Sequence, residues 1–431
     1  MVEMEHIRRL AELEAEERRL LLEETSSPPE DALPPFPEDA LTGICGDIAR
    51  LFAEHLEAPI QFWYFAALTA LGAAISGHVT LAGALREPPR LYTVLVGESA
   101  DPRKSTAIEL VSDFFKEALG DLAPYVQRGI GSAEGLAVAV ERLGAPRRVL
   151  LELDELKLFV DKAMVQGSVL LTVVNSLFSR VNYDAPTKHR NIRFEDTHLS
   201  LLAACTRETY ESMWTPAFLD IGFVNRLWVV PGKPTKDVPL PRELPEGQVQ
   251  ELKRRLREIV EKAAQATFRI RTWGTKEEVA LPYEWKLGMT PEAERVWSEW
   301  YTTTRPRDLH AKRLETYGLR LAVLLEVSRG NFEAIEADTI EKVVKLLRWQ
   351  HECRQLLFPV DAATKTAIVE EKIRKTLRRA RRMAFRDLYR AINAQRYGGY
   401  VFELAVRSLV ELGEVEVRGG RKRRLVVWVG E

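Results

Sequence analysis

The sequence predicts an α/β protein with a mainly parallel β-sheet. Apolar runs of strand-forming residues at 92–96, 147–153 and 198–204 alternate with longer segments of helical composition. Each run is followed within two residues by glycine, carboxylate or threonine side chains. Strands that alternate with helices at such intervals form parallel sheets, and the polar groups that follow them meet at the carboxyl edge of the sheet.

Charge is distributed unevenly along the chain. The 431 residues allow two to four domains, and the 62 Lys and Arg against 63 Asp and Glu give a net charge of -1. This balance alone indicates no partner. Residues 1–40 are acidic, however, and residues 361–431 are strongly basic, so we expect contact with nucleic acid at the C-terminal end.

Composition also bears on the compartment. Cys45, Cys205 and Cys353 have neither the spacing of metal ligands nor that of a disulfide framework, as expected of a reducing cytoplasm. No signal peptide is recognisable. The most apolar stretch, residues 62–76, is too short to cross a bilayer and predicts a buried helix, so we expect no membrane partner.

The N-terminal region predicts a charged helix and a linker. Residues 1–25 alternate acidic and basic side chains around a few leucines, which is typical of a charged amphipathic helix. This helix is either a solvated tail or a docking element for a partner. The proline-rich residues 26–37 predict an extended linker. Helices are expected at 40–56 and 59–77, followed by a short strand at 79–81.

A phosphate-binding loop is predicted between the strand at 92–96 and the next helix. A nucleoside triphosphate needs backbone N–H groups around its phosphates, a lysine that reaches the β and γ oxygens, and a hydroxyl on Mg²⁺. Lys104 and Ser105 fit the last two roles. The alternative is an ordinary strand-turn-helix with a surface lysine.

This loop departs from the usual P-loop pattern. Lys104 follows Gly97 by one position more than the usual spacing, and Pro102 and Arg103 stand where glycine normally gives the backbone its freedom. We nevertheless predict ATP as the ligand. The residues assigned to nucleotide binding are Gly97, Ser99, Arg103, Lys104, Ser105, Thr106 and Asp154.

Two carboxylates follow the next predicted strand. Asp154 and Glu155 end the apolar run at 147–153, and strand ends are where ligands bind in parallel sheets. We expect Asp154 and Ser105 to hold Mg²⁺, and Glu155 to activate the water that attacks the γ-phosphate. The alternative is a solvated charge pair in a strand-to-loop turn. An N-capped helix at 132–136 leads into this strand.

Further along the chain, three features have two interpretations each. Residues 188–193 carry Lys188, His189, Arg190 and Arg193, which form either a hairpin facing DNA in a ring or a solvated loop. Thr206, after the strand at 198–204, either orients the lytic water or caps the strand end. Arg226, before an apolar strand, is either a structural ion-pair partner or a finger that reaches the γ-phosphate of a neighbouring subunit.

The order of these motifs resembles the P-loop ATPases of mobile elements. The similarity covers residues 40–355 and is carried by VGESADPRKST, LLELDE, HLSLLAACTRE, GFVNRLWVV and YGLRLAVLLE. Members of that family often accompany primase or primase-polymerase modules in phages and plasmids and are regarded as replicative helicase-like proteins. The resemblance implies a RecA-like or AAA+-like core, an oligomeric ring, for which we favour a hexamer, and Arg226 as the trans-acting finger. Any primase partner would be a separate chain.

The C-terminal half predicts a helical lid and a basic winged helix. Helices are expected at 248–267, 291–304, 308–329 and 338–357, and Arg320 in the third is either a nucleotide sensor or a member of a buried ion pair. Helices at 368–380, 385–392 and 400–412, followed by a hairpin of 414–418 with 424–429, predict a winged helix that binds DNA or docks a protein. The predicted DNA-binding residues are Arg378, Arg379, Arg382, Arg421, Lys422, Arg423 and Arg424.

The sequence therefore predicts four regions and one main function. The regions are a charged helix with its linker (1–37), an ATPase core (38–238), a helical lid (239–360) and a basic winged helix (361–431). The expected function is a DNA-dependent, ring-forming ATPase, a replicative helicase or translocase that hydrolyses Mg-ATP at subunit interfaces. The alternative is a DNA-binding initiator or regulator whose altered loop binds nucleotide weakly or for assembly only.

Overall fold

The computed structural model divides the chain into two units, Met1–Pro35 and Phe36–Glu431. It describes residues 33–97, 103–186, 191–213, 218, 221–234, 236–265, 267–271, 278–282, 284–308, 310–357, 360–419 and 424–429. The predicted N-terminal helix at 1–25 lies outside these residues, and so does most of the predicted linker.

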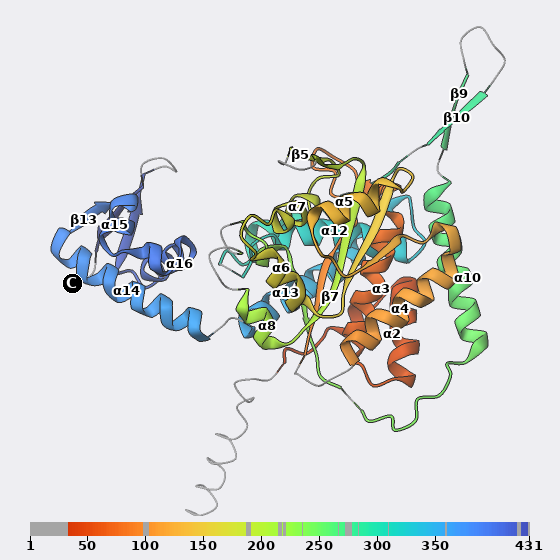
Figure 1. Ribbon diagram of the computed structural model, residues 1–431, viewed down its shortest axis with the longest axis horizontal. Coiled ribbons are helices and arrows are strands. Elements are labelled where there is room, and N and C mark those ends of the chain that lie inside the picture. Colours follow the sequence, from red (N-terminus) through yellow and green to blue (C-terminus); the bar gives the residue numbers. More distant parts are fainter. Residues whose placement is uncertain are drawn as a thin grey trace, which may run out of the picture. The chain divides into compact units, whose positions relative to one another are not determined.

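A five-stranded parallel sheet forms the centre of the larger unit (Figure 1). Its strand order is β3-β4-β7-β2-β8, and every neighbouring pair is parallel. The strands are β2 (Tyr92–Val96), β3 (Tyr125–Arg128), β4 (Arg147–Leu153), β7 (Thr197–Cys205) and β8 (Trp228–Pro231). The prediction of an α/β protein with a mainly parallel sheet is confirmed.

Helix α3 (Ile60–Ile75) is a buried helix of the core. All its residues from Phe62 onward are buried, and it contacts β2, β4 and β7 of the sheet as well as α2 (Gly43–His55) and α4 (Arg103–Leu119). Thr69 is its one polar buried side chain, and it bonds both Phe65 O and Thr93 Oγ1. The predicted buried helix is therefore confirmed, since an all-apolar surface needs packing on every side.

The remaining elements of the first part of the core are short. They are η1 (Glu38–Ala40), β1 (Val79–Leu81), η2 (Gly120–Leu122), α5 (Ala133–Glu141), α6 (Leu156–Ala163), α7 (Leu170–Leu177), β5 (Tyr183–Pro186), β6 (Asn191–Phe194), α8 (Arg207–Ser212) and η3 (Val224–Arg226). Ser132 caps α5 as predicted, because its side chain accepts from Gly135 N. β5 and β6 form an antiparallel hairpin; Lys188, His189 and Arg190 lie outside the described residues.

Residues 239–360 contain strands as well as the predicted helices. The elements are α10 (Glu246–Ala264), β9 (Thr267–Arg271), β10 (Glu278–Pro282), β11 (Trp285–Met289), α11 (Pro291–Glu299), η4 (Trp300–Thr304), α12 (Leu314–Ser328), β12 (Ala334–Ile335) and α13 (Ala337–Leu356). β11 pairs in parallel with β1 and with β12. The expectation of a purely helical lid is therefore wrong. Side chains of α12 and α13 share one hydrophobic core with α3, while the boundary at 238 stays a prediction.

The C-terminal region has a hydrophobic core of its own. Its elements are α14 (Val360–Ala380), β13 (Arg382–Ala384), α15 (Phe385–Ala391), η5 (Ala394–Arg396), α16 (Gly399–Glu411), β14 (Val415–Arg418) and β15 (Leu425–Trp428). β14 and β15 form the predicted hairpin, with Val415 opposite Trp428. β13, which was not predicted, completes an antiparallel sheet of order β13-β15-β14. Among the described helices of the whole chain, none is long and apolar enough to cross a membrane.

Candidate functional site

The carboxyl ends of β2, β7 and β4 lie at one edge of the sheet, and the predicted nucleotide-binding segments follow these ends. Val96 of β2 is level with Cys205 of β7, and Gly97 N donates to Cys205 O at 3.3 Å. Leu153 of β4 is level with Ala203 of β7. Continuing this register by two residues places Glu155 at the level of Cys205. Because β7 alone separates β2 from β4, two strand spacings, about 10 Å, lie between Gly97 and the acidic pair.

Lys104 folds back over the end of β2. It is the second residue of α4 and only 8% exposed. A Cβ atom added at Gly97 would lie 3.2 Å from Lys104 Nζ and 3.4 Å from Gly232 O. The absence of a side chain at Gly97 therefore leaves room for the lysine head beside the strand end, which is the kind of close approach that glycine permits.

Lys104 and Glu155 both influence the ionisation of Cys205, the last residue of β7. Burial raises the pKa of the Cys205 thiol well above its ordinary value, the Lys104 ammonium lowers this pKa, and the Glu155 carboxylate raises it. Both charges thus act on the end of β7 from either side. An anion with a bound cation would meet both charges here, a positive group for the anion and a negative group for the cation.

The remaining residues of the predicted metal site fit Mg²⁺ in type. Asp154 and Glu155 are exposed, and Ser105 is partly buried in the first turn of α4. No group of three or more His, Cys, Asp and Glu that could hold a metal occurs among the described residues. Mg²⁺ usually takes one or two protein oxygens together with phosphate and water, so one carboxylate and one hydroxyl suffice.

The lengthened loop itself is described only at its ends. Ser99 lies outside the described residues, as does Pro102. Arg103 begins α4 and forms an ion pair with Glu57, whose other oxygen accepts from Val238 N at 2.6 Å. Thr106 is partly buried one position after Ser105. Arg103, which stands in place of the usual glycine, thus holds the start of α4 to the loop after α2.

Thr206 caps the helix that follows β7. Its side-chain oxygen accepts from Thr209 N at 3.2 Å, and its hydroxyl donates to Thr209 Oγ1 at 3.3 Å. The capping interpretation is correct in kind, although the capped element is α8 and not the strand. A role in orienting water stays a prediction.

Arg226 lies at the opposite edge of the sheet from Lys104. It precedes β8, which runs parallel to β2, and Thr93 of β2 is level with Trp228. Its Nη1 donates to Ile221 O and Gly222 O, each at 2.9 Å. Among the described residues it has no carboxylate partner, which does not support the ion-pair interpretation. Burial, followed by repulsion from Arg313, lowers the pKa of Arg226 to about 10.

Arg320 belongs to a buried ion pair, which was one of its two interpretations. Its side chain is 1% exposed, and Nε donates to Glu87 Oε2 at 3.0 Å. Nη1 and Nη2 donate to Arg90 O and Phe178 O, each at 2.9 Å. Its donors face the interior of the fold, so the ion-pair prediction is confirmed.

Glu152 is a buried acid that the sequence analysis missed. It is 3% exposed, accepts a hydrogen bond from the Ser112 hydroxyl, and pairs with Arg128 Nε at 3.2 Å. Burial raises the pKa of Glu152, and the bonds from Ser112 and Arg128 lower it. A glutamate within an apolar strand was the available signal, because a buried carboxylate needs partners. It joins α4 to β4 two residues before Asp154.

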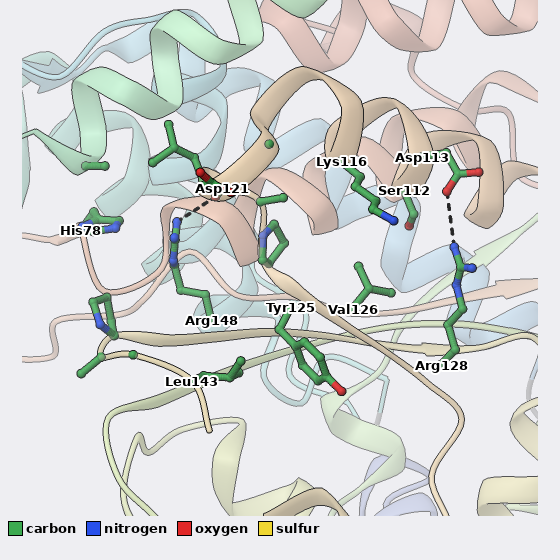
Figure 2. Close-up of a pocket in the computed structure, with 18 residues that line it drawn as sticks. His78, Ser112, Asp113, Lys116, Asp121, Tyr125, Val126, Arg128, Leu143 and Arg148 are labelled. Atoms are coloured by element: carbon green, nitrogen blue, oxygen red, sulfur yellow. Dashed lines mark hydrogen bonds and ion pairs between the residues drawn. The ribbon is translucent and has the colours of Figure 1, made fainter. Parts of the chain in front are cut away.

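A pocket of about 850 Å³ lies beside this contact, away from the strand ends. Figure 2 shows Ser112 and Lys116 of α4 above Tyr125 and Arg128 of β3. Arg148 closes another part of the wall, donating to Ala74 O and Leu122 O at 2.6 and 3.1 Å. None of the described nucleotide-binding candidates lines this pocket. It is therefore separate from the site at the carboxyl edge.

The predicted DNA-binding residues are partly described. Arg379 and Arg382 are exposed, and the Arg378 guanidinium lies 5.3 Å from the centre of the Trp428 ring. Arg424 is 3.7 Å from the Phe385 ring centre and 3.3 Å from Glu403 Oε1. Arg421, Lys422 and Arg423 lie outside the described residues.

Comparison with known proteins adds no relative. No protein-family model matches this sequence, and no curated protein matches it.

Proposed function

We propose that this chain is a DNA-dependent ATPase that works as a ring-forming helicase or translocase in the cytoplasm. The observation that supports this most is that Lys104 and the Asp154–Glu155 pair follow strands on either side of β7, at the same edge of the sheet. A triphosphate and its Mg²⁺ need a cation for the phosphates and carboxylates for the metal and the water, at a separation of several ångströms.

Each side chain then has a role in hydrolysis. Lys104 binds the β and γ oxygens, and backbone N–H groups at the start of α4 face the same phosphates. Ser105 and Asp154 hold Mg²⁺. Glu155 accepts a proton from the attacking water, and Thr206 orients that water. Gly97 supports this assignment because it leaves the lysine head room beside the strand.

The position of Arg226 supports an oligomer. β2 has five residues, so about 17 Å separate its two ends. Arg226 stands at the amino end and cannot reach a phosphate bound at the carboxyl end of its own sheet. It can act only on a phosphate that another molecule brings, as a finger does in a ring; a hexamer is the assembly that we favour.

The C-terminal region supports the DNA part of the proposal. Three helices and an antiparallel sheet with a hairpin occur in the order of a winged helix. Exposed Arg379 and Arg382 lie at the end of α14 and the start of β13. Such arginines bind phosphates with little sequence preference.

A second candidate function is a DNA-binding initiator that uses nucleotide only for assembly. The ion pair of Arg103 with Glu57 favours it, because this pair anchors the loop where glycine would normally leave the backbone free to wrap a phosphate. ATP turnover in the presence of single-stranded DNA separates the two functions, since a motor is stimulated by DNA and an assembly factor is not.

The decisive experiment compares wild type with Lys104→Ala. We expect wild type to hydrolyse ATP, faster with single-stranded DNA, and the variant to lose at least about 100-fold in kcat. Lys116→Ala, a lysine of the same helix outside this site, is the matched control. A Lys104→Ala protein that still unwinds forked DNA with ATP would eliminate the motor function.

DNA binding is tested separately. Replacing Arg378, Arg379 and Arg382 together with alanine should weaken DNA binding and reduce the dependence of affinity on salt. Each phosphate contact that is lost no longer releases counterions from the DNA. Arg254→Ala with Arg257→Ala is the control, since these arginines of α10 pair with glutamates. Equal affinity and equal salt dependence would remove the DNA assignment of this region. Whether a ring forms is tested by measuring the mass of the protein in solution with nucleotide and DNA, since a ring has the mass of several chains.

A further inference from the structure

Three arginines surround Phe178 near the amino-terminal edge of the sheet, and a fourth adjoins them. The guanidinium carbons of Arg320, Arg313 and Arg226 lie 3.9, 5.7 and 5.8 Å from the centre of the Phe178 ring. Arg90 adjoins them, because Arg320 donates to its carbonyl and its own Nη1 donates to Leu177 O at 3.0 Å. We call these four residues the Phe178 arginine cluster. Arg313 and Arg320 belong to α12 and its N-cap, whereas Arg90 and Arg226 come from segments far away in sequence, which only the fold brings together.

The cluster has an inner and an outer pair. Arg90 and Arg320 are each 1% exposed, and both donate hydrogen bonds to buried backbone carbonyls. They are structural. Arg226 and Arg313 are only partly buried, so solvent reaches part of each residue, although Nε of Arg226 is buried and its Nη1 donates to Ile221 O and Gly222 O. The outer pair is therefore the part of the cluster that can bind a ligand.

Arg226 is held by Tyr317, and Arg313 has an uncommon backbone conformation. The Tyr317 hydroxyl donates to the carbonyl of Arg226 and, at 3.4 Å, to Tyr92 O, which ties Arg226 to the first residue of β2. Arg313 immediately precedes α12 with φ +62°, in the left-handed region that arginine rarely adopts. Such strained positions are maintained only when the surrounding structure holds them, and they gather at binding sites.

Positive charge exceeds negative charge around the cluster. Among the described residues, the carboxylates near it are Glu87, which pairs with Arg320, and Glu315, which pairs with Arg305 at 3.6 Å. Neither Arg226 nor Arg313 has an ion pair with a described residue. Burial lowers the pKa of Arg313, and the nearby Arg320 lowers it further. Cations that are held together and partly out of water are destabilising until an anion joins them.

We infer that Arg226 and Arg313 together bind one phosphate group, and that this phosphate is the terminal phosphate of a triphosphate held by a second copy of this chain. Two planar guanidinium groups offer several N–H donors to the oxygens of a single phosphate. The inference rests on the proposed function. Its new element is Arg313, which becomes a second catalytic arginine beside Arg226.

The chemistry of the step needs no proton from either arginine. Water adds to the terminal phosphorus while the bond to the bridging oxygen breaks, giving ADP and inorganic phosphate. The two guanidinium groups stabilise the negative charge on the terminal oxygens throughout. A phosphate of the DNA backbone presents the same oxygens, so the experiment includes an arm for each source.

The experiment uses the full chain with Arg313→Asn and Arg313→Lys. Asparagine removes the charge but tolerates the left-handed backbone, so the variant should fold, which its melting temperature checks. We expect kcat for ATP to fall about 100-fold in Arg313→Asn, and lysine to restore only part of the rate. ATP affinity, measured on the dilute protein, should stay within twofold. Arg295→Asn, an exposed arginine of α11, is the matched control.

Mixing variants tests the action between copies. We expect the Lys104→Ala and Arg313→Asn proteins each to hydrolyse ATP very slowly when alone. A mixed assembly contains sites in which an intact Lys104 of one copy faces an intact Arg313 of another. Recovery of ATP hydrolysis on mixing supports the inference. Arg313→Asn that hydrolyses ATP at the wild-type rate overturns it and leaves the proposed function standing. Wild type that binds no ATP overturns both. Arg313→Asn could instead keep full ATP hydrolysis and lose affinity for single-stranded DNA in the absence of nucleotide. That result would show that the phosphate bound by Arg313 belongs to DNA and not to a triphosphate.

Discussion

The hydroxyl of Ser112 donates a hydrogen bond to the buried carboxylate of Glu152, and this contact joins α4 to β4. α4 carries Lys104 near its start, and β4 leads directly into Asp154. The helix and the strand that carry the proposed lysine and carboxylate sites are thus connected directly. Arg128 adds a second bond to the same carboxylate from β3.

Replacement of Glu152 by glutamine should change the pH dependence of stability. Burial raises the pKa of Glu152, so the folded protein retains this proton at pH values where the unfolded chain has lost it. The wild-type free energy of unfolding therefore falls as pH rises from the ordinary glutamate pKa through the raised one. Glu152→Gln should lack this fall. Unfolding by urea at a series of pH values measures it, and parallel profiles for both proteins would contradict the assignment.

Gly97→Ala should affect ligand binding more than folding. The added Cβ would lie 3.2 Å from Lys104 Nζ, the mobile end of a long side chain, which can move aside. We expect a stability change within about 1 kcal/mol and a loss of ATP affinity of about tenfold, because the lysine leaves its position. Gly131→Ala is the control, since a Cβ there meets no atom within 4 Å. Calorimetric titration with ATP measures the affinity of both variants, and an unchanged affinity for Gly97→Ala would show that the space beside Gly97 is not needed for ATP binding.

Two helical glycines should respond to alanine in opposite directions. A Cβ at Gly72 of α3 would clash with Pro89 O, a backbone atom of the segment that precedes β2. A Cβ at Gly247 of α10 would meet no atom within 4 Å. Gly72→Ala should destabilise by about 2 kcal/mol through overpacking. Gly247→Ala should stabilise by up to about 0.5 kcal/mol through reduced backbone entropy in the unfolded chain. Thermal unfolding distinguishes them; a stable Gly72→Ala would mean that α3 and residue 89 are not in close contact.

Arg320→Met should be strongly destabilising. It removes the buried partner of Glu87 and leaves two buried carbonyls without their donor. Breaking one side of a buried pair costs about 3–5 kcal/mol. Arg295→Met, at an exposed arginine, should stay within about 0.5 kcal/mol. Denaturant unfolding measures both, and equal effects of the two substitutions would exclude a structural role for Arg320.

The sequence predicted β2, β4, β7 and β8 of the central sheet because their residues are mostly apolar and strand-forming. It did not predict β3, whose residues are exposed or only partly buried. β2 and β7 are buried along their length, and β4 is buried from Val149 onward; such runs stand out from the charged helices around them. The order of the strands was not predictable in the same way. Periodicity reports which residues are buried but not which strand lies beside which, so the place of β7 between β2 and β4 came only from the structure.

The elements that the sequence analysis missed are short or depend on distant partners. β11 has five residues and β12 two, and both are strands only because β1 supplies a neighbour for β11. The Phe178 arginine cluster was invisible for a related reason. Arg90, Arg226 and the pair Arg313 and Arg320 come from three separate segments, and no sequence pattern connects these segments. The contact of Arg226, Arg313 and Arg320 with the Phe178 ring exists only after folding.

The parallel pairing of β1 with β11 also has a consequence for synthesis. Val79 leaves the ribosome long before Trp285, its partner in the sheet. In the nascent chain, the apolar α3 and the edge of β1 must therefore wait uncovered while the following segments are translated, which is the situation that chaperones relieve. We therefore expect a fragment that ends before β11 to present this unpaired strand edge to other chains and to aggregate.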